Sequence, residues 1–224
     1  MASPTHAAGA DGGVREVRIA PTGLEGLLGI PPGAGALVVF AHGSGSSRLS
    51  PRNNQVAAAL RQAGLATLLF DLLLPEEAAD RHNVFDIDLL AERLLGATGW
   101  LRERPDTRDL TIGYFGASTG AAAALVAAAR APASVGAVVS RGGRPDMAGA
   151  ALAGVRCPTL LIVGGDDHAV LDLNRTALDR LTCEKRLEIV PGAGHLFEEP
   201  GALDRVIELA RAWFVRHLRE RAGA

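Results

Sequence analysis

Residues 116–120, Gly-Ala-Ser-Thr-Gly, constrain the fold most because of what flanks them. The apolar residues 110–115 predict a buried strand, and the alanine-rich residues 121–130 predict a buried helix. A strand that enters a helix through Gly-x-Ser-x-Gly must bend sharply at the serine, and the glycines let the two elements approach closely. Ser118 would lie at the helix N-terminus, where free N–H groups favour negative charge. We predict a nucleophile elbow at Ser118; the alternative is an ordinary tight turn.

Strands and helices alternate along the rest of the chain. The expected strands are residues 14–20 and 24–30, which form a hairpin, and 36–41, 65–69, 110–115, 135–140, 158–163 and 187–190. The expected helices are residues 53–63, 86–104, 121–130, 173–181 and 202–221, with a short helical piece at 147–152 and a polar loop at 75–83. Continuous apolar strands between amphipathic helices predict an α/β fold with a mostly parallel sheet covered on both faces.

Length and composition fit one domain. The chain has 224 residues, of which 48% are hydrophobic and 21% charged, which suits a single α/β domain over residues 14–224. Residues 1–13 lack a basic segment and an apolar core, so we expect a disordered leader and no signal peptide. No apolar run approaches the ~18 residues of a membrane span. We therefore expect a cytoplasmic protein without a membrane partner.

The charge pattern gives no sign of nucleic-acid binding. The net charge is −2, and no basic stripe is interleaved with aromatic side chains. No HExxH motif or paired-ligand spacing is present, so we expect neither a metal nor another cofactor. The remaining class of partner is a small-molecule substrate. Nothing in the sequence indicates an oligomeric state.

Four of the predicted strands end in chemically distinctive residues. His42-Gly43-Ser44-Gly45 follows residues 36–41, and Ser118 follows residues 110–115. Asp166 and Asp167 follow residues 158–163, and His195 follows residues 187–190. Because ligands bind at the carboxyl ends of parallel strands, these residues are expected along one edge of the sheet.

Chemistry explains why a serine, a histidine and an aspartate belong together. A serine hydroxyl needs a neutral imidazole to accept its proton, and the imidazole needs a carboxylate to fix its tautomer. The chain order Ser118, Asp167, His195 is the order expected for this topology. Asp166 is the alternative carboxylate, with loop capping as its other interpretation, and Asp172 is expected to cap a helix. For His195 the alternative is a surface histidine.

Two backbone N–H groups are predicted to form an oxyanion hole, those of Ser44 and of Thr119, the residue after the nucleophile. His42 is expected to order its loop by hydrogen bonds, and it is also a candidate for substrate contact. The other candidates for substrate contact are Arg141, His168, Val170 and Leu196. The loop arginines Arg48, Arg52, Arg81, Arg141 and Arg144 either select an acidic acyl group or serve surface solubility.

These motifs together resemble the small, lidless dienelactone hydrolase-like members of the α/β-hydrolase superfamily. The resemblance runs from about residue 14 and is carried by HGSGSS at 42–47, GASTG at 116–120, GGDDHAV at 164–170 and GAGHLF at 192–197. It implies the α/β-hydrolase fold with little or no cap domain. It also implies Ser118 as nucleophile, His195 as base, Asp167 as its orienting carboxylate, and the Ser44 and Thr119 amides as oxyanion donors.

The resemblance includes one departure. Dienelactone hydrolases proper have a cysteine where this chain has Ser118, which favours a general serine esterase. The expected activity is hydrolysis of carboxylic esters through an acyl-enzyme. One alternative is an acyltransferase, or an amide, thioester or lactone hydrolase, on the same triad. Another is a non-catalytic scaffold that binds a ligand.

Overall fold

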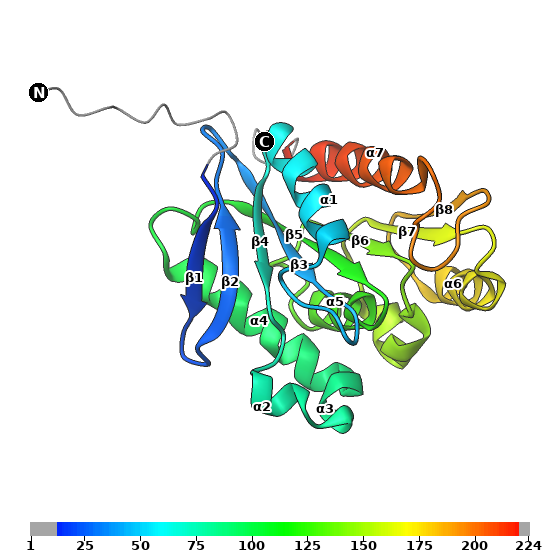
Figure 1. Ribbon diagram of the computed structural model, residues 1–224, viewed down its shortest axis with the longest axis horizontal. Coiled ribbons are helices and arrows are strands. Elements are labelled where there is room, and N and C mark those ends of the chain that lie inside the picture. Colours follow the sequence, from blue (N-terminus) through cyan, green and yellow to red (C-terminus); the bar gives the residue numbers. More distant parts are fainter. Residues whose placement is uncertain (1–12, 220–224) are drawn as a thin grey trace, which may run out of the picture.

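A sheet of eight strands forms the centre of the molecule, in the order β1-β2-β4-β3-β5-β6-β7-β8 (Figure 1). The computed structural model describes residues 13–219. Strands β3 to β8 are parallel, and β2 is antiparallel to both of its neighbours. The strands are β1 (Arg15–Ile19), β2 (Leu24–Gly29), β3 (Ala36–Ala41), β4 (Ala66–Phe70), β5 (Thr111–Ala117), β6 (Ala137–Arg141), β7 (Thr159–Gly164) and β8 (Lys185–Val190).

Helices cover both faces of this sheet (Figure 1). On one face, α1 (Pro51–Gln62) packs against α7 (Ala202–Phe214), and on the other lie α4 (Ile87–Glu103), α5 (Thr119–Arg130) and α6 (His168–Arg180). Each face has its own apolar core. All residues of β3, β4, β6 and β7 are therefore buried, which explains why these sequences are mostly apolar.

The predicted fold class is confirmed, and most predicted elements shift by no more than two residues at either end. The start of α1 illustrates why. Ser50 caps the helix by accepting a hydrogen bond from Asn53 N–H at 3.4 Å, and Pro51 occupies its first position. The helix consequently begins two residues before the predicted start.

Two regions differ more. Residues 75–83 were expected to be a polar loop, but α2 (Pro75–Ala78) lies there, and α3 (Arg81–Phe85) begins there. Glu77 accepts the Leu74 N–H at 2.9 Å and Asp80 accepts the His82 N–H at 2.8 Å, so each short helix has its own cap.

Helix α6 begins at His168, five residues before the predicted start at 173. Asp172, expected to cap this helix, lies within it and pairs with Arg175 at 3.0 Å. The residue at the cap position is Asp167, whose side chain makes no capping hydrogen bond. That carboxylate is free to interact elsewhere.

No cap domain is inserted between the strands of the described chain. Between β6 and β7 there is a short 3₁₀ segment, η1 (Pro145–Gly154), that packs on α5 and α6. Helix α7 ends at Phe214, before the predicted end at 221, and passes into a π-helical turn, η2 (Val215–Arg219). Apart from Gly13, the leader predicted for residues 1–13 lies outside the described residues. Over residues 13–219, the helices are too short or too polar to cross a bilayer.

We predict that Gly116→Ala and Gly120→Ala each lower the free energy of unfolding by about 3 kcal/mol or more. A Cβ at position 116 would overlap the backbone of Ala121, and one at position 120 would overlap the carbonyl groups of Ala41 and His42. Backbone atoms cannot rotate away as a side chain can. Urea unfolding of each variant measures the loss.

Gly96→Ala is the matched control, because a Cβ there meets no atom within 4 Å and the residue lies inside α4. Alanine is the better helix former, so this variant should gain about 0.5–1 kcal/mol. Equal stability of all three variants would contradict the close packing described for β5 and α5.

Candidate active site

Ser118 joins β5 to α5 in a strained backbone conformation, with φ of 50° and ψ of −122°. Its N–H donates to the Arg141 carbonyl at 3.3 Å, and its own carbonyl accepts from Arg144 N–H at 3.0 Å. Such strain costs on the order of 1–3 kcal/mol and persists only where surrounding contacts enforce it. The predicted strand, sharp turn and helix are present, and Ser118 directly precedes the first turn of α5, whose N–H groups lack helical acceptors.

Asp167 and His195 form a hydrogen-bonded pair at the carboxyl ends of β7 and β8. His195 Nδ1 lies 2.7 Å from Asp167 Oδ2, and the carboxylate is mostly buried, with 15% of its side chain exposed. An ionised carboxylate only accepts hydrogen bonds, so the proton of the neutral ring lies on Nδ1. His195 Nε2 is thereby left as a proton acceptor. Asp166, the alternative carboxylate, is exposed.

Ser118 and His195 line one cavity of about 710 Å³, which we call the serine cavity. Arg141, Leu196 and the loop of residues 43–47 also line it. Within residues 13–219, no hydrogen bond joins the Ser118 hydroxyl to the imidazole. Catalytic hydrogen bonds of this kind often shorten only when substrate is bound. The structure therefore brings together residues from the ends of β3, β5, β6, β7 and β8, and Gly43 and Leu196 at the serine cavity lie 153 positions apart in the chain.

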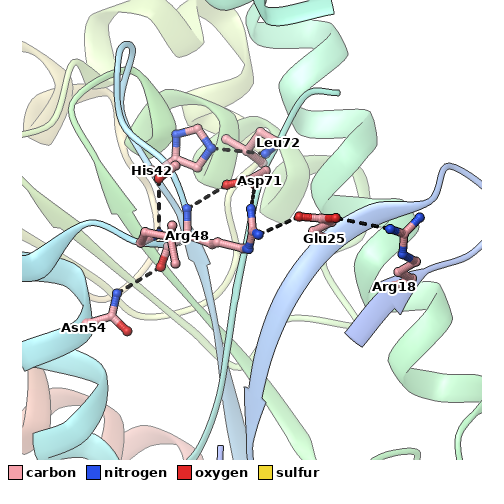
Figure 2. Close-up of polar contacts among 9 residues, drawn as sticks. Arg18, Glu25, His42, Arg48, Asn54, Asp71 and Leu72 are labelled. Atoms are coloured by element: carbon pink, nitrogen blue, oxygen red, sulfur yellow. Dashed lines mark hydrogen bonds and ion pairs between the residues drawn. The ribbon is translucent and has the colours of Figure 1, made fainter. Parts of the chain in front are cut away.

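The loop that follows β3 is fastened to the end of β4 (Figure 2). Arg48 N–H donates to Asp71 Oδ1 at 2.7 Å, and the Arg48 guanidinium pairs with the other oxygen of that carboxylate and with Glu25 at 2.5 Å. His42 Nε2 accepts the Leu72 N–H at 3.1 Å. These contacts fix the loop beside Ser118. The approach is close at Gly43, because a Cβ at this position would meet the Ser118 Cβ at 2.9 Å.

The two amides predicted for the oxyanion hole lie next to each other. Thr119 is the first residue of α5, where a main-chain N–H has no helical acceptor. Ser44 N–H donates to Thr119 Oγ1 at 3.0 Å. To bind an oxyanion, the Ser44 N–H must either divide its hydrogen bond between the Thr119 hydroxyl and the oxyanion or give up its bond to the hydroxyl. The oxyanion role of both amides stays a prediction.

A second cavity, of about 290 Å³, lies on the other side of the same loop. We call it the apolar cavity, because Leu72, Leu73, Val84 and Leu90 contribute to its wall. Residues 43–47 and Thr119 border it as well. Residues 43–47 therefore border both the serine cavity and the apolar cavity beside α2, α3 and α4.

The predicted substrate-contact residues fall into three groups. Arg141 and Leu196 line the serine cavity, and His42 lines the apolar cavity. His168 and Val170 line neither of these two cavities. The arginines expected in loops are placed differently: Arg52 lies in α1, Arg81 begins α3 and Arg141 ends β6. Of the five, Arg52 and Arg141 line the serine cavity.

Sequence reasoning missed the residues that support these groups. Asn53 is buried and accepts a hydrogen bond from Arg141 Nη2 at 3.3 Å, although it occupies an ordinary helical position. Val84 reaches the apolar cavity from α3, a helix that the sequence analysis did not predict. The capping residues Glu77 and Asp80 were the available signal. They indicate helices over residues 75–85, which would have placed Val84 near the site.

Both ring nitrogens of His42 have partners, as expected for an ordering role. Nε2 accepts from Leu72 N–H, so the proton lies on Nδ1, which donates to the Gly43 carbonyl at 2.9 Å. Burial lowers the pKa of His42 below the usual value of 6.5, and this outweighs the opposing effects of the Gly43 hydrogen bond and the Asp71 charge. The ring is therefore neutral at pH 7.

Comparisons with known proteins place the chain in a family. It matches the model of the dienelactone hydrolase family over residues 24–213. A solved structure of dienelactone hydrolase from Anabaena variabilis ATCC 29413 has a TM-score of 0.88 and 59% identity, covering 92% of this chain and 97% of that one. The protein described here belongs to the dienelactone hydrolase family, and the resemblance inferred from its motifs is confirmed.

Two further relatives define the limits of the comparison. Est1E from Butyrivibrio proteoclasticus has a TM-score of 0.77 at 15% identity, covering 92% of this chain and 99% of that one, and so shares the α/β-hydrolase fold. A protein of Mycobacterium tuberculosis H37Rv, provisionally named a phosphoribosyl transferase, is 59% identical over 203 residues. The match covers 91% of this chain and 46% of that protein, so the chain spans about half the length of this relative.

The neutral state of His42 predicts how stability depends on pH. Because the pKa of His42 is lower in the folded than in the unfolded chain, its contribution to stability is complete above about pH 6.5 and is lost as pH falls through the folded pKa. His42→Gln, which keeps an acceptor for Leu72 N–H, should lose less stability between pH 7 and pH 5 than the wild type. Urea unfolding at both pH values measures this difference.

An NMR titration of the histidine rings is the direct check on this prediction. The His42 ring should titrate below pH 6.5 and show the Nδ1–H tautomer at pH 7. A midpoint at or above 6.5 would show that the ring is not held neutral by burial.

Proposed function

We propose that this protein is a serine hydrolase that cleaves carboxylic esters through an acyl-enzyme formed on Ser118. The observation that carries the proposal is the 2.7 Å hydrogen bond between His195 Nδ1 and Asp167 Oδ2 at a cavity that Ser118 also lines. This bond leaves His195 Nε2 as a proton acceptor on the same cavity as a hydroxyl held at a strained turn. Membership of the dienelactone hydrolase family supports the hydrolytic class.

The proposed reaction has two halves. Ser118 Oγ attacks the ester carbonyl carbon while His195 Nε2 takes the hydroxyl proton, and the carbonyl oxygen becomes an oxyanion. The ester C–O bond then breaks, and the alcohol leaves with the proton from His195. In the second half a water molecule, deprotonated by His195, attacks the acyl carbon and releases the acid and the free serine. Asp167 keeps the imidazole in one tautomer and stabilises its transient positive charge.

The oxyanion is proposed to receive the N–H groups of Thr119 and Ser44. Thr119 begins a helix of 12 residues, whose N-terminal end favours negative charge. Ser44 N–H donates to Thr119 Oγ1 and would share its hydrogen between this hydroxyl and the oxyanion. Losing one such donor typically costs about 10²–10³ in rate.

The names of relatives bear on the substrate in different ways. The Anabaena protein is named a dienelactone hydrolase, and a lactone is a cyclic ester that the same two half-reactions would open. The name of the Mycobacterium protein refers to a longer chain, and the match with this protein covers 46% of it. The matched part is the part assigned here to the dienelactone hydrolase family, and phosphoribosyl transfer is not part of the proposal.

We predict that Ser118→Ala lowers kcat for 4-nitrophenyl esters by at least about 10³-fold and abolishes labelling by a fluorophosphonate. Asp167→Asn should lower kcat by about 10²–10⁴-fold, because an amide no longer selects the Nδ1–H tautomer. Steady-state kinetics on purified protein measure both losses, and the urea midpoint of each variant confirms that it is folded.

Asp166→Asn is the matched control, since Asp166 is the exposed neighbour of Asp167. Its kcat should stay within about threefold of the wild type, because an exposed charge interacts weakly. An equal loss in both variants would refute the role assigned to Asp167, and full turnover by Ser118→Ala would refute the mechanism. Added alcohols then show whether the acyl group passes to water or to another acceptor.

A further inference from the structure

The Thr119 hydroxyl lies next to both amides that are proposed to bind the oxyanion. Thr119 follows Ser118 directly and is buried, with 4% of its surface exposed. Its Oγ1 accepts the Ser44 N–H at 3.0 Å. Ser44 lies beside the nucleophile, because a Cβ on its neighbour Gly43 would come within 3.7 Å of Ser118 Oγ. A hydroxyl group therefore lies close to where the proposed oxyanion forms, although the reaction described above gives it no task.

The proton of this hydroxyl has no acceptor in the described part of the chain. A threonine hydroxyl can donate one hydrogen bond and accept two. Thr119 Oγ1 accepts the bond from Ser44, and it donates to none of the residues that the structure describes. Three of the other four buried threonines in this part of the chain donate to main-chain carbonyl groups, at 2.9, 2.7 and 3.1 Å: Thr98, Thr107 and Thr159. Because buried donors are normally satisfied, the unused proton of Thr119 suits an acceptor that arrives with the substrate.

The position of this hydroxyl bond is open to a ligand. Ser44 lines both the serine cavity and the apolar cavity, and Thr119 lines the apolar cavity. The bond between them therefore lies at the border of space that a substrate can enter. An ester whose carbonyl carbon meets Ser118 Oγ would bring its carbonyl oxygen toward this bond.

Sharing of the Ser44 N–H directs the hydroxyl proton toward the oxyanion. An N–H that divides its hydrogen bond between two acceptors needs both on the same side, within about 3–4 Å of each other. Two oxygen atoms at that distance repel each other when both present lone pairs, and here one of them is charged. Rotation of the hydroxyl proton onto the oxyanion replaces the repulsion by an O–H···O⁻ bond, which is among the stronger hydrogen bonds. The Ser44 N–H would meanwhile hold Oγ1 in place and polarise its O–H bond.

We propose that the Thr119 hydroxyl is a third oxyanion donor, beside the N–H groups of Thr119 and Ser44, and thus a catalytic group. The inference rests on the proposed ester hydrolysis and adds a side chain to its oxyanion hole. As Ser118 Oγ bonds to the carbonyl carbon, an electron pair of the C=O bond moves onto the oxygen, and the Thr119 hydroxyl donates to that oxygen. The proton stays on Oγ1, and the bond weakens when the carbonyl re-forms and the alcohol leaves. Because the bond is stronger to the oxyanion than to the neutral carbonyl, it favours the transition state over the bound ester.

The kinetic test is Thr119→Val, which keeps the shape of the side chain and removes the hydroxyl. It should lower kcat for 4-nitrophenyl butyrate by about 10- to 10³-fold and leave KM within about threefold, because the lost bond acts on the oxyanion and not on the bound ester. Thr119→Ser keeps the hydroxyl, so its kcat should stay within about tenfold of the wild type. Wild-type or faster turnover by Thr119→Val would overturn the proposal, because it would show that the Ser44 N–H acts better without the hydroxyl.

Thr98→Val is the matched control, because it makes the same substitution at a buried threonine of α4 whose hydroxyl contacts the Tyr114 hydroxyl at 2.7 Å. It should lower the urea midpoint, since the buried Tyr114 hydroxyl loses its partner, and leave kcat within about threefold of the wild type. Thr119→Val should lose less stability, because its partner Ser44 is exposed. Equal losses of kcat in the two variants would assign the effect to packing and overturn the proposal.

A trifluoromethyl ketone distinguishes a donor from a hydroxyl that only holds the loop. Ser118 Oγ would add to its carbonyl carbon and form a hemiketal, whose oxyanion takes the place of the oxyanion in the reaction. In a crystal structure of this adduct, Thr119 Oγ1 should lie about 2.5–2.7 Å from the hemiketal oxygen. By fluorine NMR titration, the hemiketal should be a weaker acid by about tenfold or more in Thr119→Val, because a donor stabilises the ionised form. A Thr119 hydroxyl turned away from this oxygen, or an unchanged acidity, would overturn the proposal.

The same experiments separate this inference from the proposed function. If the wild type neither hydrolyses the ester nor forms the hemiketal on Ser118, the proposed function is refuted and the role of Thr119 with it. If Ser118→Ala abolishes turnover while Thr119→Val changes neither kcat nor the acidity of the hemiketal, the role of Thr119 alone is refuted. A loss of kcat in Thr119→Val that Thr119→Ser restores, with Oγ1 on the hemiketal oxygen, is the expected result.

Discussion

The close approach of α5 to strands β3 and β5 determines where Ser118 can lie. Side chains at Gly116 and Gly120 would collide with main-chain atoms of α5 and β3, so the serine turn is pressed against both strands. A Cβ at Gly43, in the loop after β3, would meet the Ser118 Cβ at 2.9 Å. Three glycines thus fix the serine, the helix N-terminus and the loop with the Ser44 amide relative to one another. Other elements of the site are placed against this unit.

The hydrogen bond between Asp167 and His195 is possible because the Asp167 side chain does not cap its own helix. Asp167 occupies the cap position of α6, where an aspartate side chain usually accepts a helix N–H. Its oxygen Oδ2 instead contacts the His195 ring, and the side chain gives the helix no cap. The loop that carries His195 is held by Asp166 N–H, which donates to the Ala193 carbonyl at 3.0 Å. The two neighbouring aspartates therefore contribute in different ways, one through its side chain and one through its backbone.

Elements whose position follows from neighbouring residues alone could be predicted from the sequence. Unbroken apolar strands and the turn at Ser118 could be recognised because propensity and burial agree there. The helices of residues 75–85 were missed because their caps lie within a polar segment that also looks like a loop. The Ser44 to Thr119 bond was missed because it joins a backbone donor to a hydroxyl 75 positions away. Arg141 was expected in a loop but is the last residue of β6, and its hydrogen bond to Asn53 could not be foreseen because it joins positions 88 apart in the chain.

The central claim is that Ser118 becomes acylated, and a slow ester tests it most directly. Rapid mixing with 4-nitrophenyl trimethylacetate should release a burst of about one equivalent of nitrophenol, followed by slow turnover. Intact-protein mass spectrometry during the slow phase should find one acyl group, and peptide mapping should place it on Ser118. A linear release of nitrophenol with no adduct, or an adduct on another residue, would contradict the account.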